Sequence, residues 1–269
     1  MKQTRIFFTT FFIAFSFMLC GFAALYWIAD YSSPIQTGEN RTDIPILTPD
    51  YNDSKTALIV MDTDSADFFF LLKLNALQKK VSLVSVPSSF YLSSAGRTMG
   101  ESMKYAGIMQ CVQDICAEFD ITVNYHLLCD KTSMDSLLSS FSGFSADIFP
   151  DMPQSIKSFL LKGSEYIDTT TLVNSVDMSA AVLDNPLGLE FLSAAGLQLL
   201  ENNMQNICDY ALADIKNNFS NLTTNIGTQD IDRLKRIISF LIDDSTKYDR
   251  IVLSDTETAQ GEIDSILKE

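Results

Sequence analysis

TALIVMDTDSADFFFLLKLNALQKKVSLVSV, residues 56–86, decides the fold that we expect for this chain. It holds three apolar runs of strand length, at 56–61, 67–74 and 81–86, joined by short polar segments. Continuous apolar runs of this length, bounded by turn residues, are typical of strands that are buried on both faces. The stretch therefore predicts three neighbouring strands of a central sheet that begins with a hairpin.

The rest of the chain mixes further strands with helices. Apolar residues that recur at spacings of three and four predict helices at 107–119, 134–141 and 189–219, and a further helix that follows Thr228–Asp230 and ends at Leu241; short apolar runs predict strands at 121–129 and 249–253. Strands mixed with helices after an initial hairpin indicate an α/β or mixed α+β fold. Its central β-sheet is expected to be flanked by helices on its faces.

An uncharged, Phe-rich run at 6–29 precedes this domain, with Lys2 and Arg5 before it. Its length suits a hydrocarbon layer about 30 Å thick, and the preceding basic residues favour a cytoplasmic N-terminus. A cleaved signal peptide is the alternative, but the run exceeds the usual apolar region of about 7–15 residues and no A-x-A site follows. The predicted organisation is a cytoplasmic tail at 1–5, a transmembrane signal anchor at 6–29, an extracellular linker at 30–55 and an extracytoplasmic domain at 56–269 on the cell membrane.

The charge of the exported part is strongly acidic. Residues after the anchor carry all 34 acidic residues but only 17 of the 19 basic ones. A surface with this balance repels phosphate backbones, so the composition argues against nucleic acid as a partner. It also argues against flat binding to anionic lipid headgroups.

Cysteine and histidine usage excludes several kinds of site. Cys111, Cys116, Cys129 and Cys208 follow the anchor without a C-x-x-C pair, and His126 is the only histidine. A zinc site and most Ser-His-Asp or Cys-His arrangements are therefore not expected. Each cysteine is interpreted as a small buried apolar residue, and His126 as a structural residue.

The order of segments resembles the LytR-CpsA-Psr family of cell-envelope proteins. ALIVMD at 57–62 resembles the family's first strand, which ends in Asp, and SADFFFLLKLN at 65–75 resembles the second, which opens with Ser-Asp. KKVSLVSVP at 79–87 is similar to the third strand, which in the family runs into Pro-Arg-Asp. TMGESMKYAG at 98–107 and LTTNIGTQDIDRLKRIISFL at 222–241 are similar to later family segments.

The resemblance implies an activity. Family members are anchored by one N-terminal helix and attach glycopolymers to peptidoglycan from undecaprenyl-pyrophosphate-linked donors, with a divalent metal. On this chain it implies a Mg²⁺ site at Asp62 and Asp67, with Asp64 between them. An acidic, solvated loop without a metal is the alternative interpretation of these residues. It also implies an apolar pocket for the polyprenyl tail, for which Phe68, Phe69, Phe70 and Phe90 are candidates, although each can equally be an ordinary core residue.

The family's arginines are missing from the matched positions. The corresponding residues are Ser65, Ser88, Asp177 and Leu189, and Ser89 replaces the family's Asp. Arg97 is the single arginine between Arg41 and Arg233. Because an arginine fork grips phosphate oxygens in pairs, one arginine is too few for a pyrophosphate cage. Arg97 and Lys104 are the candidate phosphate contacts; Lys73, inside a predicted strand, is interpreted as facing solvent.

Three functions remain open at this point. The first is a membrane-anchored protein of envelope glycopolymer assembly that binds polyprenyl phosphate or pyrophosphate lipid but lacks the catalytic arginines. The second is an active phosphotransferase that joins glycopolymer to peptidoglycan. The third is a non-enzymatic sensor or interaction ectodomain.

Overall fold

The computed structural model describes residues 48–63, 67–139, 141–145, 166–174, 186–217, 222–254 and 256–268. The predicted anchor at 6–29, with Asp64, Ser65 and Asp177, lies outside these residues. Within the described part, no helix is both long and apolar enough to cross a membrane.

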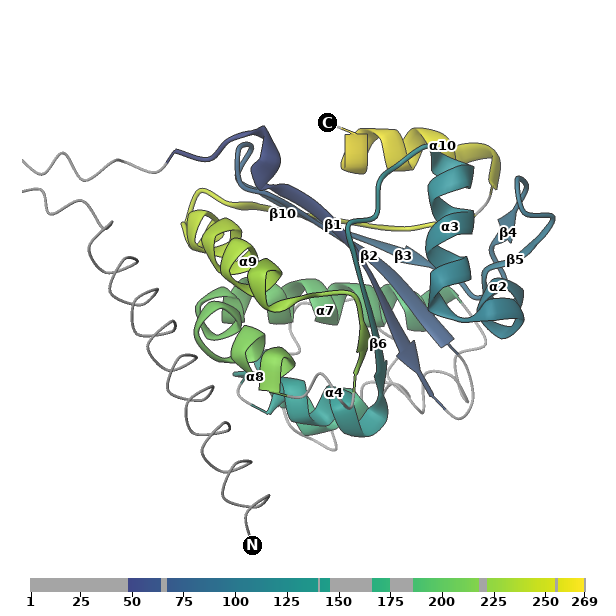
Figure 1. The fold of residues 1–269 in the computed structure, drawn as a ribbon. Helices are drawn as coiled ribbons and strands as arrows, with labels where there is room; N and C mark the ends of the chain where they lie inside the picture. The colour runs from purple at the N-terminus through teal and green to yellow at the C-terminus, as the bar shows by residue number, and fades with distance from the viewer. Residues whose placement is uncertain are drawn as a thin grey trace, which may run out of the picture. The chain divides into compact units, whose positions relative to one another are not determined.

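A six-stranded mixed sheet forms the centre of the domain, with strand order β10-β3-β2-β1-β6-β9 (Figure 1). Its strands are β1 (Ser54–Asp62), β2 (Asp67–Asn75), β3 (Lys80–Val86), β6 (Tyr125–Asp130), β9 (Thr223–Thr224) and β10 (Lys247–Val252). β1, β2 and β3 form an antiparallel meander, β6 adds parallel to β1, and β10 adds parallel to β3. The three strands and the hairpin predicted from residues 56–86 are confirmed.

Helices cover both faces of the sheet, as expected (Figure 1). One face packs against α4 (Lys131–Leu138), α7 (Pro186–Asn206), α8 (Leu212–Asn217) and α9 (Thr228–Leu241); the other packs against α2 (Met99–Ala106), α3 (Ile108–Phe119) and α10 (Thr256–Ile263). Two π-helical turns, at Ile207–Ala211 and Asp264–Lys268, follow α7 and α10, and a 3-10 helix at Tyr51–Asp53 precedes β1. Short hairpins pair β4 (Tyr91–Leu92) with β5 (Arg97–Thr98) and β7 (Phe144–Ser145) with β8 (Tyr166–Ile167).

The phenylalanines of β2 divide between the two cores. Phe68 and Phe70 belong to the core beneath α7 and α9, whereas Phe69 belongs to the core beneath α3 and α10. Phe90 joins Phe69 and lies 5.9 Å, centroid to centroid, from Phe119. Because successive strand side chains point to opposite faces, the sheet itself separates these rings. The four phenylalanines therefore do not line one common pocket.

Lys73 does not face solvent, so that interpretation was wrong. Its residue is 6% exposed, and its Nζ donates a hydrogen bond of 2.7 Å to the backbone carbonyl of Leu267. This carbonyl lies in the π-helical turn after α10, an element that the sequence analysis did not predict. A helix end presents unpaired carbonyls and partial negative charge, so a buried ammonium is stabilised there.

The predicted helix at 189–219 is interrupted. Asn203 is 1% exposed and has non-helical backbone angles, φ −125° and ψ 15°. Its side-chain amide donates to the carbonyl oxygens of Ser142 and Leu199 and accepts from the amide of Ser142. The side chain thus pairs with a distant loop, and the helix is kinked where this occurs.

Two other boundaries shifted because of local capping and pairing. α4 begins at Lys131 rather than at 134, because the Asp130 carboxylate caps the helix by accepting from the Ser133 amide at 2.7 Å. β6 begins at Tyr125 rather than at 121. The sequence analysis did not predict α2. A reciprocal capping box between Thr98 and Glu101 caps its N-terminus, and Gly107, at φ +72°, separates it from α3.

Candidate functional site

Two carboxylates face each other at the loop end of the β1–β2 hairpin. Asp62 and Asp67 are the last pair of the antiparallel register, at the ends of their strands. Burial raises the pKa of Asp67, and the charge and hydrogen bond of Asp62 raise it further, while the Lys104 ammonium opposes them. A raised pKa is expected where two carboxylates lie close together, because their mutual repulsion is reduced when one of them holds a proton or when both bind a cation.

The pair fits Mg²⁺. This ion is usually held by one or two carboxylates, with waters and substrate phosphate oxygens completing its shell. The described residues contain no group of three or more acidic, histidine or cysteine side chains suited to a metal. Asp130 lies beside Asp62 in the parallel β1–β6 register, but its carboxylate is used to cap α4. Asp62 and Asp67 are thus the residues that would hold a metal, and their role as Mg²⁺ ligands remains a prediction.

α2 brings one basic residue to this pair. Lys104, on the exposed side of α2, acts electrostatically on Asp67. The capping box at Thr98 fixes the start of the helix that carries it. The structure therefore brings Asp62 and Asp67 together, and of the two predicted basic residues it is Lys104 whose charge lowers the pKa of Asp67.

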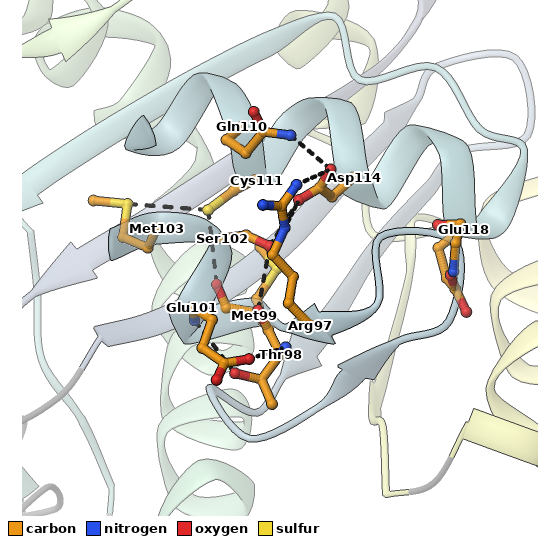
Figure 2. Close-up of polar contacts among 11 residues, drawn as sticks. Arg97, Thr98, Met99, Glu101, Ser102, Met103, Gln110, Cys111, Asp114 and Glu118 are labelled. Atoms are coloured by element: carbon orange, nitrogen blue, oxygen red, sulfur yellow. Dashed lines mark hydrogen bonds and ion pairs between the residues drawn. The ribbon is translucent and has the colours of Figure 1, made fainter. Parts of the chain in front are cut away.

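Arg97, the fourth, lies in a polar cluster between β5, α2 and α3 (Figure 2). Its Nε donates to Asp114 Oδ2 at 3.1 Å, and its guanidinium stacks on Tyr105 with Cζ 4.6 Å from the ring centroid. The Ser102 hydroxyl and the Gln110 amide also donate to the Asp114 carboxylate, each at 2.7 Å. Burial raises the pKa of Asp114, but these hydrogen bonds outweigh it and lower that pKa overall.

Sequence reasoning missed Asp114. It is 7% exposed and lies on α3 between the buried residues Cys111 and Ile115. A charged residue on the apolar face of a predicted helix was the available signal, since buried carboxylates are nearly always paired. Two nitrogens of Arg97 already bond this partner, which offsets the charge that Arg97 could offer a phosphate.

Two other arginines of the described part are paired with carboxylates. Arg236 pairs with Asp53, and Arg250 pairs with Glu190. Asp53 precedes the first residue of the nine-residue strand β1, so the Arg236 pair lies about 30 Å along the strand from Asp62. Arg236 is therefore held away from the carboxylate pair.

Ser88 lies against the backbone of Gly100. The Gly100 amide donates to the Ser88 carbonyl at 2.9 Å, and a Cβ on Gly100 would lie 2.2 Å from Ser88 Oγ. The loop after β3 is thereby tied to the first turn of α2. Ser88 occupies the place of a family arginine, and Leu189, matched to another, is 7% exposed in the core.

Cys111, Cys129 and His126 are buried, as expected, but the prediction that every cysteine is buried was wrong for Cys116 and Cys208. Cys111 and Cys129 are buried, and burial raises the pKa of each thiol to about 12. Cys116 and Cys208 are partly exposed, and all four are free. His126 is 7% exposed in β6, and burial lowers its pKa. None of them joins the carboxylate pair as a metal group.

Comparison with known proteins identifies the fold. No protein-family model matches the chain, and no curated protein matches it. Among solved structures, a protein from Eubacterium siraeum assigned as a transcription regulator superposes with a TM-score of 0.64 at 14% identity, over 84% of this chain and 97% of that one. Bacillus subtilis TagT superposes with a TM-score of 0.57 at 18% identity, over 83% and 95%. TagT bound to LIIa-WTA gives 0.57 at 16% identity, over 81% and 92%. The LytR-CpsA-Psr-like fold predicted from the sequence is confirmed.

Replacing Asp67 by Asn should stabilise the protein at neutral pH in the absence of Mg²⁺. The pKa of Asp67 is higher in the folded state than its ordinary 3.8, so the folded protein holds the proton more tightly than the unfolded chain does. The free energy of unfolding therefore falls as pH rises from 3.8 through that higher pKa. Asp67→Asn removes this loss, so its advantage should be present at pH 7 and vanish below pH 3.8. Urea unfolding across pH 3–8 measures it.

Asp130→Asn is the matched control, and its effect on the free energy of unfolding should have the opposite sign: it should destabilise the protein at pH 7. The hydrogen bond from Ser133 lowers the pKa of Asp130, so the wild-type carboxylate stabilises the fold above its ordinary pKa and that stability is lost as pH falls. If Asp67→Asn were less stable than wild type at pH 7, the claim that the Asp62 and Asp67 carboxylates repel each other in the folded protein would be contradicted.

Gly100→Ala should destabilise the fold by about 1–3 kcal/mol, because its Cβ collides with Ser88. Adding Ser88→Ala removes the colliding Oγ and should restore part of the loss, since the Ser88 Cβ lies at an ordinary 3.6 Å while the Ser88 carbonyl oxygen stays at a tighter 3.3 Å. Gly261→Ala, in open space on α10, is the control and should be neutral or stabilising by up to about 1 kcal/mol. Chemical denaturation of the four proteins checks this; the absence of any rescue would count against the contact.

Proposed function

We propose that this chain is a divergent LytR-CpsA-Psr protein that binds polyprenyl phosphate or pyrophosphate lipid without transferring the attached glycopolymer. Its place is the assembly of cell-envelope glycopolymers, with lipid-linked polymer or peptidoglycan as the partner. The likeness of fold to TagT, which has been seen bound to LIIa-WTA, supports the class of ligand. The carboxylate pair with Lys104 supports a phosphate-binding position at the end of β1 and β2.

The engagement of the arginines is the observation that carries this proposal. Phosphoryl transfer from a pyrophosphate needs positive charge around the phosphate oxygens, since the protein contributes mainly positioning and electrostatic stabilisation. Arg97 is neutralised by Asp114, and Arg236 and Arg250 are paired with Asp53 and Glu190. Among the described residues, the basic group whose charge acts on Asp67 is Lys104, a point charge without the paired donors of arginine.

The residues present suit binding. When bound, Mg²⁺ would supply positive charge that offsets the phosphate oxygens. Asp62 and Asp67 would hold it, and Lys104 would contact a phosphate oxygen from α2. Burial of Asp67 lowers the local dielectric and strengthens these attractions.

The anchor belongs to the same proposal. The uncharged run at 6–29 would hold the chain in the cell membrane with residues 56–269 outside the cytoplasm. A domain tethered there meets membrane-borne lipid donors without leaving the bilayer surface.

An active phosphotransferase is the second candidate, and the Asp62–Asp67 pair favours it. In this version Arg97 exchanges Asp114 for a donor phosphate, and Lys104 joins it. The exchange would leave Asp114 buried without its cation, a change that costs several kcal/mol unless a conformational change relieves it.

Binding of undecaprenyl phosphate by the full chain in nanodiscs tests the proposal. Mg²⁺ should tighten binding to wild type, and Asp62→Asn with Asp67→Asn should weaken the Mg²⁺-dependent binding by about tenfold or more, about 1.4 kcal/mol. Asp130→Asn, the neighbouring carboxylate that caps α4, should bind within about twofold of wild type, because Asn also caps a helix. Wild-type protein that binds no polyprenyl phosphate would refute the lipid-binding function.

A further inference from the structure

We propose that the domain docks end-on against the outer surface of the membrane through three exposed side chains, Tyr51, Leu77 and Ile242, here called the proximal patch. The inference rests on the membrane anchor of the proposed function, but not on lipid binding at Asp62 and Asp67. It assigns a partner to a surface that the carboxylate pair does not use.

The proximal patch is built from three segments that are far apart in the sequence. Tyr51 lies in the 3-10 helix before β1, Leu77 lies in the turn between β2 and β3, and Ile242 directly follows α9. The three residues are 88%, 56% and 38% exposed. Single exposed apolar residues are common on protein surfaces, but a group of them at one place is typical of a binding surface.

Direct contacts bring these three segments together. The Ala76 amide donates to the Asp53 carbonyl at 3.1 Å, which joins the β2–β3 turn to the 3-10 helix. Lys79 forms an ion pair with Asp243, and the Lys247 amide donates to the Lys79 carbonyl at 2.9 Å. These contacts join the same turn to the loop between α9 and β10, so the patch lies at one end of the sheet (Figure 1).

Charge around the proximal patch is balanced, unlike the charge of the whole exported part. The segments 50–55, 76–80 and 242–247 hold four acidic and four basic residues: Asp50, Asp53, Asp243 and Asp244 against Lys55, Lys79, Lys80 and Lys247. The residues after the predicted anchor hold 34 acidic and 17 basic residues. An anionic bilayer repels an acidic surface, so a neutral end can approach the headgroups where the rest of the domain cannot lie flat.

The path of the chain leads to the same end of the sheet. The described residues begin at Thr48, three positions before Tyr51, and the predicted anchor ends at residue 29. A flexible linker formed by the 21 residues from 30 to 50 would hold its two ends about 25 Å apart on average. A tether of this length gives a high effective concentration at the bilayer, so a few side chains suffice for docking.

The residue types of the proximal patch fit a bilayer better than a second protein. A tyrosine ring with its polar hydroxyl suits the interface between water and hydrocarbon, and aliphatic side chains enter the acyl boundary. Lys247 is exposed at the start of β10, and its long stem allows the ammonium to reach lipid phosphates. A stable protein interface buries about 1,200–2,000 Å², more than three side chains supply.

Docking by this end leaves the opposite end of the sheet facing away from the membrane. β3 runs from Lys80, beside the patch, to Val86, and the Gly100 amide donates to the Ser88 carbonyl at 2.9 Å just beyond that strand. α2, which begins at this contact and carries Tyr105, therefore lies towards the far end. The far end is also where the β1–β2 hairpin presents its two carboxylates.

Tryptophan fluorescence of the full chain in nanodiscs tests the docking. Trp27, in the predicted anchor, is the only tryptophan, so Trp27→Phe provides a background without tryptophan emission. In that background, Tyr51→Trp places a reporter on the patch. Tyr105→Trp, at a residue 71% exposed, is the matched control on α2. The nanodiscs contain phosphatidylethanolamine and phosphatidylglycerol with brominated acyl chains, which quench tryptophan on contact; the same lipids without bromine give the reference.

Bromine should quench the Tyr51→Trp protein and leave the Tyr105→Trp protein unchanged. Adding Leu77→Ser and Ile242→Ser to Tyr51→Trp should lower the ratio of docked to undocked protein by about tenfold or more and remove most of the quenching, because two aliphatic side chains no longer enter the bilayer. Both positions are exposed, so the urea midpoint should not change.

The control and the two serine substitutions decide the outcome. Quenching of Tyr51→Trp that is no greater than that of Tyr105→Trp, or that persists in full after both serine substitutions, would overturn docking by the proximal patch. If the protein still co-elutes with the nanodiscs in that case, the anchor and the proposed lipid binding stand. Protein that does not co-elute with the nanodiscs would refute the anchor, and the docking with it.

Discussion

The pairing of β1 with β2 is the constraint on which the rest of the structure depends. Its register runs without a break from Ser54 opposite Asn75 to Asp62 opposite Asp67. A slip of one residue would exchange the two faces of β2, moving Phe69 into the core of Phe68 and Phe70. The same slip would separate the two carboxylates. One ladder of backbone hydrogen bonds thus sets both hydrophobic cores and the candidate metal pair.

Three arginines of the described part are used in ion pairs within the protein. Acidic residues outnumber basic ones along the chain, and three of its arginines pair with carboxylates, Arg97 with Asp114, Arg236 with Asp53 and Arg250 with Glu190. Asp53 and Asp114 are buried, so breaking either pair would leave an uncompensated charge in the interior. The Arg97 and Arg236 guanidinium groups are structural for that reason. Among the described residues, Lys104 is the basic group whose charge acts on Asp67, and a single lysine is suited to holding a ligand rather than to stabilising charge in a transition state.

The sheet was predictable because its signal is local. Residues 56–86 hold three apolar runs whose lengths and turns specify strands, and Asp62 and Asp67 are fixed by where the first two runs end and begin. Lys73 was misjudged because its partner, the Leu267 carbonyl, is 194 positions away in a helix with little apolar periodicity. The kink at Asn203 likewise depends on the distant Ser142 loop. Counting arginines identified Arg97, and Asp114 could be suspected from its place on the apolar face of a predicted helix, but their pairing depends on how β5 packs against α3.

The central claim is that the chain binds the lipid-linked donor but does not transfer its polymer. The most direct measurement follows release of polyprenyl phosphate from a lipid-pyrophosphate-linked glycan, with full-length protein in nanodiscs, Mg²⁺ and peptidoglycan present. The account predicts that donor remains bound and that release stays at the rate without protein. Release above that rate, abolished by Asp67→Asn, would contradict it and establish an active transferase.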